Sequence, residues 1–402
     1  MTSQRASPAE KIELFRSLFR SRDDVYPRRF ESRKTGKSGY SPICAHEWVR
    51  GICEKPRVKC GDCRHRSFLP VTDDVIRWHL SGHDDAGQPF VVGVYPMLQD
   101  ETCYFLAIDF DKNEWQQDVL AFAATCRTRG LAPAVERSRS GRGAHVWFFF
   151  EEPVPTALAR KVGSILLTEA MESRPDIGFD SYDRLFPNQD TLPHGGFGNL
   201  IALPLQKQAR ELGNTVFVDD SLEPHADQWD FLSHIDRLRR STLERLTADA
   251  ERHGGVIGVR IPSLDEDDTQ PWALSPSRVP AVRAIAGTLP HELEVVVAND
   301  VYVPSESLPP ALRNRILGLA AFQNPEFYRA QAMRLPTYDK PRVISCAEAH
   351  AQHIGLPRGC LDDVRDLLRG LHITFRIRDE RCAGEPVDVS FRGELRADQL
   401  ES

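Results

Sequence analysis

One segment, from Tyr104 to Asp111, constrains the fold of this 402-residue chain more than any other. Its sequence, YFLAIDFD, is too apolar over the first five positions for either face to meet water, which indicates a buried β-strand. Side chains alternate along a strand, so Asp109 and Asp111 lie on one face. Two carboxylates that close repel each other unless cations lie between them, and we interpret the pair as ligands of divalent metal ions.

A second segment, 138–150, joins a short basic turn to another buried strand. The turn contains Ser140, Gly141, Arg142 and Gly143. His145 lies where the turn becomes the strand. Backbone amides of a glycine turn beside an arginine favour anions. We therefore expect an anion-binding turn next to the metal site.

The composition is that of an ordinary globular protein, with 41% hydrophobic and 27% charged residues. No stretch approaches the ~18 apolar residues of a membrane span, and the first ten residues lack the apolar core of a signal peptide. We therefore expect a cytoplasmic protein of two or three domains that does not associate with membranes.

The net charge of −7 is distributed unevenly, because residues 1–70 hold 16 Lys or Arg against 8 Asp or Glu. Only this part is suited to a polyanion. Its basic residues between Arg28 and Lys37 surround Phe30 and precede Tyr40, a composition suited to phosphates and a stacking ring. A solvated basic loop fits the same composition equally well.

Four of the nine cysteines fall within twenty residues: Cys44, Cys53, Cys60 and Cys63. Their spacing, which includes the tight pair Cys60-Gly-Asp-Cys63, predicts a closed tetrahedral site for structural zinc. His46 and His65 are possible substitute ligands. The alternative is four unrelated buried thiols, and disulfides are not expected in a reducing compartment.

Strands alternate with helices, expected near 114–129 and 155–172, which indicates an α/β or α+β core. The stretch 179–190 is rich in carboxylates and turn formers. The glycine loop 195–199 precedes a strand at 200–204 and then Lys207. This loop is suited to a phosphate, but a plain hairpin explains its glycines at least as well.

We divide the chain into four parts. Residues 1–88 form a helix, the basic loop and the cysteine site, and residues 89–260 form the catalytic core. Residues 261–284 are an acidic, proline-containing linker. Residues 285–402 form a small α/β module without a catalytic constellation.

With these motifs in place, the chain resembles the archaeo-eukaryotic primase (primase-polymerase) superfamily. The superfamily's D-x-D strand, its S-G-x-G-x-H turn and its third Asp correspond to Asp109-Phe110-Asp111, to Ser140–His145 and to an Asp within 180–190. More narrowly, GYSPICAHEW, YDRLFPNQD and GGFGNLIALPLQK are similar to the primase domain of TOTE conflict systems, which a superfamily 2 helicase usually follows. The final stretch 391–399 resembles the lead-in to that helicase, so we expect any helicase partner on a separate polypeptide.

The resemblance implies an α+β fold: an RRM-like catalytic core, an additional N-terminal α/β unit with a zinc-binding insertion, and a small C-terminal α/β module. It implies a DNA primase/polymerase that adds nucleotides to a 3′-hydroxyl, within a conflict or defence system. DNA, or RNA, would be template and primer, and nucleoside triphosphates would be substrates.

The resemblance also implies roles for single residues. Asp109, Asp111 and Asp183 would hold two Mg²⁺ or Mn²⁺ ions. We choose Asp183 over Asp180 and Asp190 because it lies in the YDRLFPNQD run. The incoming triphosphate would be bound by Ser140, Gly141, Arg142, Gly143 and His145, with help from Lys207.

Two other classes of function remain open from the sequence. A metal-dependent nuclease could use the same carboxylates with water as the nucleophile. A catalytically silent nucleic-acid-binding module could use only the zinc and basic segments, although the intact carboxylates argue against it.

Overall fold

The structure is a computed structural model that describes residues 5–32, 35–253, 285, 287–384, 387–388, 390 and 392–394. The linker predicted at 261–284 lies outside these residues. The chain forms two compact units: Met1–Leu289 with Leu308–Cys346, and Pro290–Ser307 with Ala347–Ser402. The expected C-terminal module at 285–402 is therefore smaller than the sequence suggested, because Leu308–Cys346 packs with the first unit.

The first unit is built on a six-stranded sheet in the order β7-β4-β6-β5-β9, with β10 paired to β6. The strands are β4 (Thr102–Phe110), β5 (Ala134–Arg137), β6 (Ala144–Pro155), β7 (Leu185–Phe186), β9 (Phe217–Val218) and β10 (Arg237–Leu238). The long strand β4 contains the apolar segment that the sequence predicts to be buried. It pairs antiparallel with β6 on one side and with β7 on the other.

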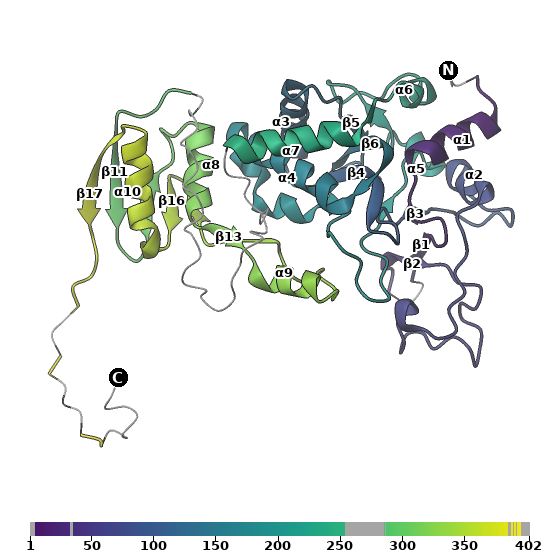
Figure 1. The fold of residues 1–402 in the computed structure, drawn as a ribbon, viewed down its shortest axis with the longest axis horizontal. Helices are drawn as coiled ribbons and strands as arrows, with labels where there is room; N and C mark the ends of the chain where they lie inside the picture. Colours follow the sequence, from purple (N-terminus) through teal and green to yellow (C-terminus); the bar gives the residue numbers. More distant parts are fainter. Residues whose placement is uncertain are drawn as a thin grey trace. The chain divides into compact units, whose positions relative to one another are not determined.

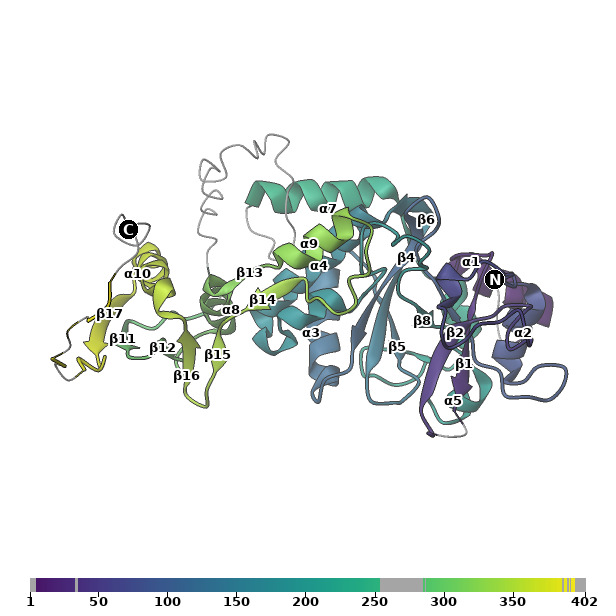
Figure 2. The same cartoon turned by 90° about the horizontal axis from the view of Figure 1, so that it is seen from below.

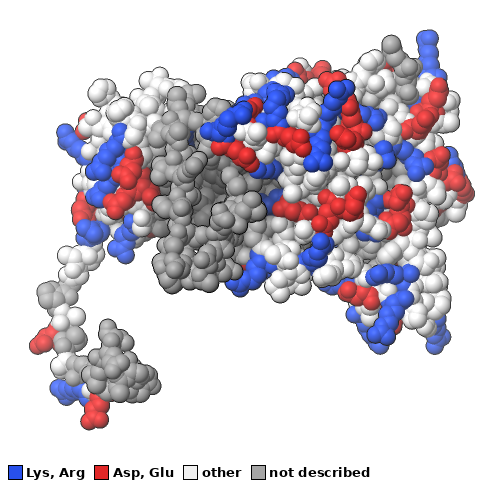
Figure 3. Space-filling model, in the orientation of Figure 1, with Lys and Arg blue, Asp and Glu red and all other residues white. Residues whose placement is uncertain are grey.

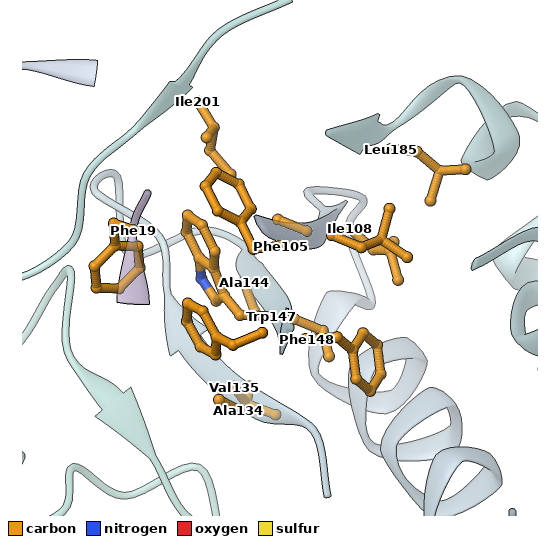
Figure 4. Close-up of a cluster of buried hydrophobic side chains, with 14 of the residues drawn as sticks. Phe19, Phe105, Ile108, Ala134, Val135, Ala144, Trp147, Phe148, Leu185 and Ile201 are labelled. Carbon is orange, nitrogen blue, oxygen red and sulfur yellow. The ribbon is translucent and has the colours of Figure 1, made fainter. Parts of the chain in front are cut away.

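Helices α3 (Trp115–Thr128), α4 (Thr156–Ser173) and α7 (Arg240–His253) lie on one side of this sheet, and Figure 2 shows them opposite α1 and α2. A Cβ atom on Gly163 of α4 would lie 3.0 Å from side chains of Leu106 and Leu185, so the helix packs very close to the strands. Ile108 and Phe148 extend this apolar layer (Figure 4).

The other face of the sheet receives the N-terminal helix α1 (Pro8–Leu18), which Ser7 and Glu10 cap reciprocally. Phe19 follows α1 and packs edge-on against Trp147 and Phe149, at ring-centroid distances of 5.1 and 5.3 Å. The remaining elements near this face are α2 (Asp73–Ser81), β3 (Gly93–Val94), β8 (Ile201–Ala202), α5 (Lys207–Glu211) and α6 (Gln228–Ser233).

The N-terminal part also forms the antiparallel hairpin of β1 (Pro27–Glu31) and β2 (Ser38–Pro42). A loop from Cys44 to Phe68 leaves this hairpin and returns to it, closed by a β-bridge between these two residues. We call this loop the cysteine module. Its short 3-10 helix spans Cys60–Asp62.

The segment 308–346 contributes α8 (Pro310–Leu319), β13 (Ala321–Gln323), α9 (Pro325–Ala332) and β14 (Val343–Ser345) to the first unit. Helix α8 packs on α4, and β13 pairs with β14.

The second unit contains a five-stranded sheet in the order β15-β16-β12-β11-β17 and the helix α10 (Leu361–Gly370). Its strands are β11 (Glu292–Val297), β12 (Val301–Pro304), β15 (Glu348–Ala349), β16 (His353–Leu356) and β17 (Thr374–Asp379). The whole is a mixed helix-and-sheet protein (Figure 1). None of the helices described is long and apolar enough to cross a membrane.

Candidate active site

Three polar side chains share one face at the end of the central sheet. The register of the strands places His145 of β6 opposite Asp109 of β4 and opposite Glu136 of β5. Directly opposed residues point to the same face of a sheet. His145 Nε2 lies 3.8 Å from Asp109 Oδ1, and the Asp109 side chain is 25% exposed.

Buried Glu136 fixes the orientation of His145. Its Oε2 accepts hydrogen bonds from His145 Nδ1 at 3.0 Å and from Trp147 Nε1 at 2.9 Å. The proton on Nδ1 is inferred from its carboxylate partner, and Nε2 is then the nitrogen that faces Asp109. Burial lowers the pKa of His145, but the negative charges of Glu136 and Asp109 outweigh it, and the pKa is raised above its ordinary value.

The predicted anion-binding turn packs directly against the end of β4. A Cβ atom on Gly143 would lie 2.6 Å from the carbonyl oxygen of Phe110, so only glycine allows this approach. The turn is closed by the Ser138 amide, which donates to the Gly143 carbonyl at 2.9 Å. Ser140 Oγ accepts from the Arg142 amide at 3.2 Å. The structure therefore brings this turn beside Asp109 and Asp111.

Two cations neutralise Asp111 and Asp180, two other carboxylates at this end of the sheet. The Arg184 guanidinium pairs with Asp111 and lies 3.3 Å from Asp180. Lys112 Nζ lies 2.6 Å from Asp180. Asp109, Asp111, Lys112 and Arg184 line one small pocket, which makes this end of the sheet a compact cluster of alternating charges.

Asp183 is not part of this cluster. The Asp109 amide donates to the Arg184 carbonyl at 3.0 Å, which places Arg184 beside Asp109. Asp183 instead accepts a hydrogen bond from the Arg342 amide at 2.9 Å. Burial raises the pKa of Asp183. Its carboxylate thus binds the segment 308–346, and Asp180, three residues earlier, is the one that lies with Asp111.

Asp190 also has a packing role. It pairs with the buried Arg160 and accepts a hydrogen bond from Gln331 Nε2 at 2.9 Å. Charge from Arg160 and Arg342 lowers its pKa against the effect of burial, which is the larger single influence. The YDRLFPNQD run therefore holds α9 and its flanks onto the core.

Carboxylate oxygens of Asp109, Asp111 and Asp180 are the hard ligands that Mg²⁺ and Mn²⁺ prefer. Within the described parts of the chain, however, no three His, Cys, Asp or Glu side chains are grouped closely enough to hold a metal ion. At this site Arg184 and Lys112 each bind a carboxylate that a metal ion would need. The carboxylate oxygens therefore suit a divalent ion, provided that Arg184 and Lys112 release them when the ion binds.

The four cysteines of the module line a common pocket with His46 and His65. Cys44 Sγ accepts backbone hydrogen bonds from the amides of His46 at 3.4 Å and Ser67 at 3.3 Å. Such bonds stabilise a thiolate, the form that binds zinc. The chemistry of the donors therefore fits zinc, although no three of these side chains are among the groups that could hold a metal ion in the described residues.

The glycine loop 195–199 contacts the cysteine module. A Cβ atom on Gly61 would lie 2.2 Å from the Gly195 carbonyl oxygen. Phe197 packs edge-on against Phe68 at 5.1 Å. Close backbone packing thus explains Gly61 and Gly195. Lys207 begins α5 and, among the described residues, pairs with Glu211 at 4.0 Å rather than with the turn.

The basic hairpin approaches the anion-binding turn. Arg29 and Tyr40 face each other in the register of β1 and β2. Burial raises the pKa of Tyr40, and the charges of Arg139 and Arg29 oppose this effect. Arg139 Nη1 is buried without a hydrogen-bond partner in the described structure. A donor for an anion is therefore present between hairpin and turn.

Sequence reasoning missed Glu136, Arg184 and Arg139. Glu136 had a signal, because it is the lone carboxylate of a short strand that is otherwise apolar up to Arg137. The positions of Arg184 and Arg139 depend on strand register and on the hairpin, which the sequence does not display.

The sequence matches the family described as "TOTE conflict system, Archaeo-Eukaryotic Primase domain" over residues 10–246, which is more than half of the chain. No curated protein is significantly similar to it.

Two solved structures share 12% sequence identity with the chain. The polymerase domain of Ligase D from Mycobacterium tuberculosis, solved with DNA, gives a TM-score of 0.29 and covers 60% of this chain and 89% of its own. The AEP domain of the primase-polymerase from cyanophage S-2L gives 0.22 and covers 50% and 96%. Both TM-scores are low, and we draw nothing further from them. By its sequence match, the chain belongs to the archaeo-eukaryotic primase family of TOTE conflict systems.

Proposed function

We propose that this protein is a primase-polymerase that adds nucleotides to the 3′-hydroxyl of a primer on a DNA template, with RNA as the other possible template. The observation that supports this most is the meeting of Asp109, Asp111 and the turn 138–145 at one end of the sheet, in a chain of a primase family. A role in conflict or defence follows from the family's name alone.

In the proposed reaction, the 3′-oxygen bonds to the α-phosphorus of the incoming triphosphate. The bond from that phosphorus to the β-phosphate oxygen breaks, pyrophosphate leaves, and the hydroxyl proton passes to solvent. Asp109 and Asp111, with Asp180 in place of Asp183, would hold Mg²⁺ or Mn²⁺. Two such ions activate the hydroxyl and neutralise the leaving group when they are bound.

The protein's own groups would hold the triphosphate. The turn offers the amide of Gly143 and the exposed guanidinium of Arg142, while the Gly141 amide donates to the Ser138 carbonyl at 3.0 Å and helps to shape the turn. His145 presents Nε2 toward the same place because Glu136 binds Nδ1. Ser140 shapes the turn. Lys207 is a weaker candidate for binding the triphosphate, since its ion-pair partner lies on its own helix.

We also propose structural zinc at Cys44, Cys53, Cys60 and Cys63, and a helicase as a partner. The zinc proposal is supported by the shared pocket of the four thiols and by the amide bonds to Cys44.

The deciding experiment is primer extension. The purified chain is incubated with Mg²⁺ or Mn²⁺, a labelled primer on a longer template, and each nucleotide pool. We expect a lengthened primer, loss of that product in Asp109→Asn, and normal extension in Asp236→Asn, whose side chain is exposed and distant in sequence.

The same gel separates the other classes of function. A shortened primer would identify a metal-dependent nuclease. An unchanged primer that is nevertheless bound would identify a silent nucleic-acid-binding module.

A further inference from the structure

The cysteine module displays a tryptophan that the fold does not bury. Trp48 is 69% exposed and has a left-handed backbone, with φ of 62°. That conformation costs free energy for a residue with a large side chain. Burial of the indole does not offset the cost here. Backbone strain of this kind clusters at active sites and ligand-binding sites.

The turn that carries Trp48 is fixed by the backbone. The Val49 amide donates to the His46 carbonyl at 3.1 Å, and the Cys53 amide donates to the Val49 carbonyl at 2.9 Å. Lys55 Nζ lies 5.7 Å from the centre of the indole ring. The ring is therefore presented on an ordered turn, with one face toward a cation.

The module around Trp48 is basic, with six Lys or Arg against three Asp or Glu between Cys44 and Phe68. Lys55 is neutralised by Glu47 at 2.7 Å. Four exposed cations have no acidic partner among the described residues: Arg50, Arg57, Lys59 and Arg64. Lys and Arg gather at this end of the unit in Figure 3.

The neighbouring hairpin continues this chemistry. Phe30 of β1 is 49% exposed and packs beside Gly39 of β2. Arg29 lies next to it in the strand and pairs with Glu31 at 3.8 Å. Exposed rings, together with the unpaired cations of the module, match a strand whose bases are unstacked and whose phosphates run alongside. A duplex would hide its bases from the rings.

We propose that the cysteine module is a platform for single-stranded nucleic acid, with the Trp48 indole stacked on a base and Arg50, Arg57, Lys59 and Arg64 against nearby phosphates. This deepens the proposed function, on which it rests, because it gives the unpaired template a docking surface in the same unit as the turn and the carboxylates.

The test is fluorescence anisotropy of the full-length chain with a labelled single-stranded 20-mer and with a duplex of equal length. Wild type should bind the single strand more tightly. Trp48→Ala should weaken that binding about tenfold, and Trp48→Phe should restore most of it, because stacking needs a ring. Tyr338→Ala removes an aromatic residue that is 81% exposed outside the module, and should bind as wild type does.

Charge is tested in the same assay. Arg57→Gln should reduce the slope of log affinity against log salt by about 0.7, the value for one phosphate contact on a single strand. Circular dichroism and thiol titration confirm that each variant is folded.

Unchanged binding in folded Trp48→Ala would overturn the platform. So would Trp48→Leu that binds as well as Trp48→Phe, since bulk rather than stacking would then matter. Nucleotide incorporation is measured separately. Wild type that binds in this pattern but extends no primer would support the platform and contradict the polymerase function. Wild type that extends a primer but binds equally well after Trp48→Ala would support the polymerase function and contradict the platform.

Discussion

Glu136 is the residue on which the geometry of the candidate site depends most. It is 1% exposed, and one of its oxygens serves both His145 and Trp147. A hydrogen bond to a charged group contributes about 1.5–3 kcal/mol, so its loss has measurable consequences. Glutamine keeps the shape of the side chain but removes the charge that favours protonated His145.

We therefore expect Glu136→Gln to raise KM for the nucleotide about tenfold or more, while primer binding changes little. Steady-state extension at varied nucleotide concentration measures it. Glu151→Gln, on the exposed part of the same β6 strand as His145, is the matched control and should behave as wild type. If Glu136→Gln changed only the unfolding free energy, Glu136 would have a packing role alone.

The local sequence pattern was sufficient to predict the positions of some site residues and insufficient for others. Asp109, Asp111 and the turn 140–145 come together because each lies at the end of a strand that its own apolar sequence specifies. Asp183, chosen for its place in the YDRLFPNQD run, does not lie on a strand. It lies in a 3-10 helix, Phe179–Asp183, and the strand begins only at Leu185. The two-residue alternation that places Asp109 and Asp111 on one face does not apply there.

This difference between elements gives a paired prediction for Asp180 and Asp183. Asp180→Asn should lower nucleotide incorporation strongly and leave stability nearly unchanged, because its side chain is 52% exposed. Asp183→Asn should lower the free energy of unfolding by about 1–3 kcal/mol, because a buried amide of Arg342 loses its charged acceptor. Urea unfolding and primer extension measure the two effects. Loss of incorporation in a fully stable Asp183→Asn protein would restore Asp183 as the metal ligand.

The apolar segment 90–95, whose sequence by itself indicates one continuous strand, shows a second limit at the level of elements. Only Gly93–Val94 pairs with β8, because neighbouring backbone groups bind elsewhere. The Val92 amide donates to His79 Nδ1 at 3.1 Å, and His79 Nε2 donates to the Pro204 carbonyl at 2.9 Å. A buried histidine of α2 thus replaces part of the strand pairing.

His79 also predicts how stability depends on pH. Burial lowers the pKa of His79 from 6.5 to about 4. Between these values the unfolded chain binds a proton that the folded chain does not, so stability falls as pH falls through this window. The full shift corresponds to about 3 kcal/mol. The free energy of unfolding of wild type and His79→Gln, measured from pH 7 to pH 4.5, should converge as the pH is lowered. Unfolding free energies of the two proteins that stay parallel over this pH range would contradict the prediction.

At the level of the whole molecule, the sequence predicted the family, which the match over residues 10–246 confirms, and the mixed helix-and-sheet class. It did not predict that Leu308–Cys346 belongs to the first unit. That packing depends on Arg342, buried at 2% exposure, whose guanidinium donates to the Asn188 carbonyl and lies 4.3 Å from the Phe327 ring. Contacts between residues so far apart in sequence leave no periodic signal for a single sequence to show.

The cysteine module supplies the last prediction, since its knuckle packs on the glycine loop between β7 and β8 of the first unit. If zinc binds only to the folded chain, a free zinc concentration of 100 times its Kd would add about 2.7 kcal/mol to the free energy of unfolding. Metal analysis should find close to one zinc per chain. Cys60→Ser should lose the metal and unfold at a lower temperature, because the knuckle no longer holds the loop. Cys346→Ser, which changes an exposed cysteine outside the module, should keep both metal and stability. A wild-type protein that is folded and free of zinc would show instead that the four thiols are held by packing alone.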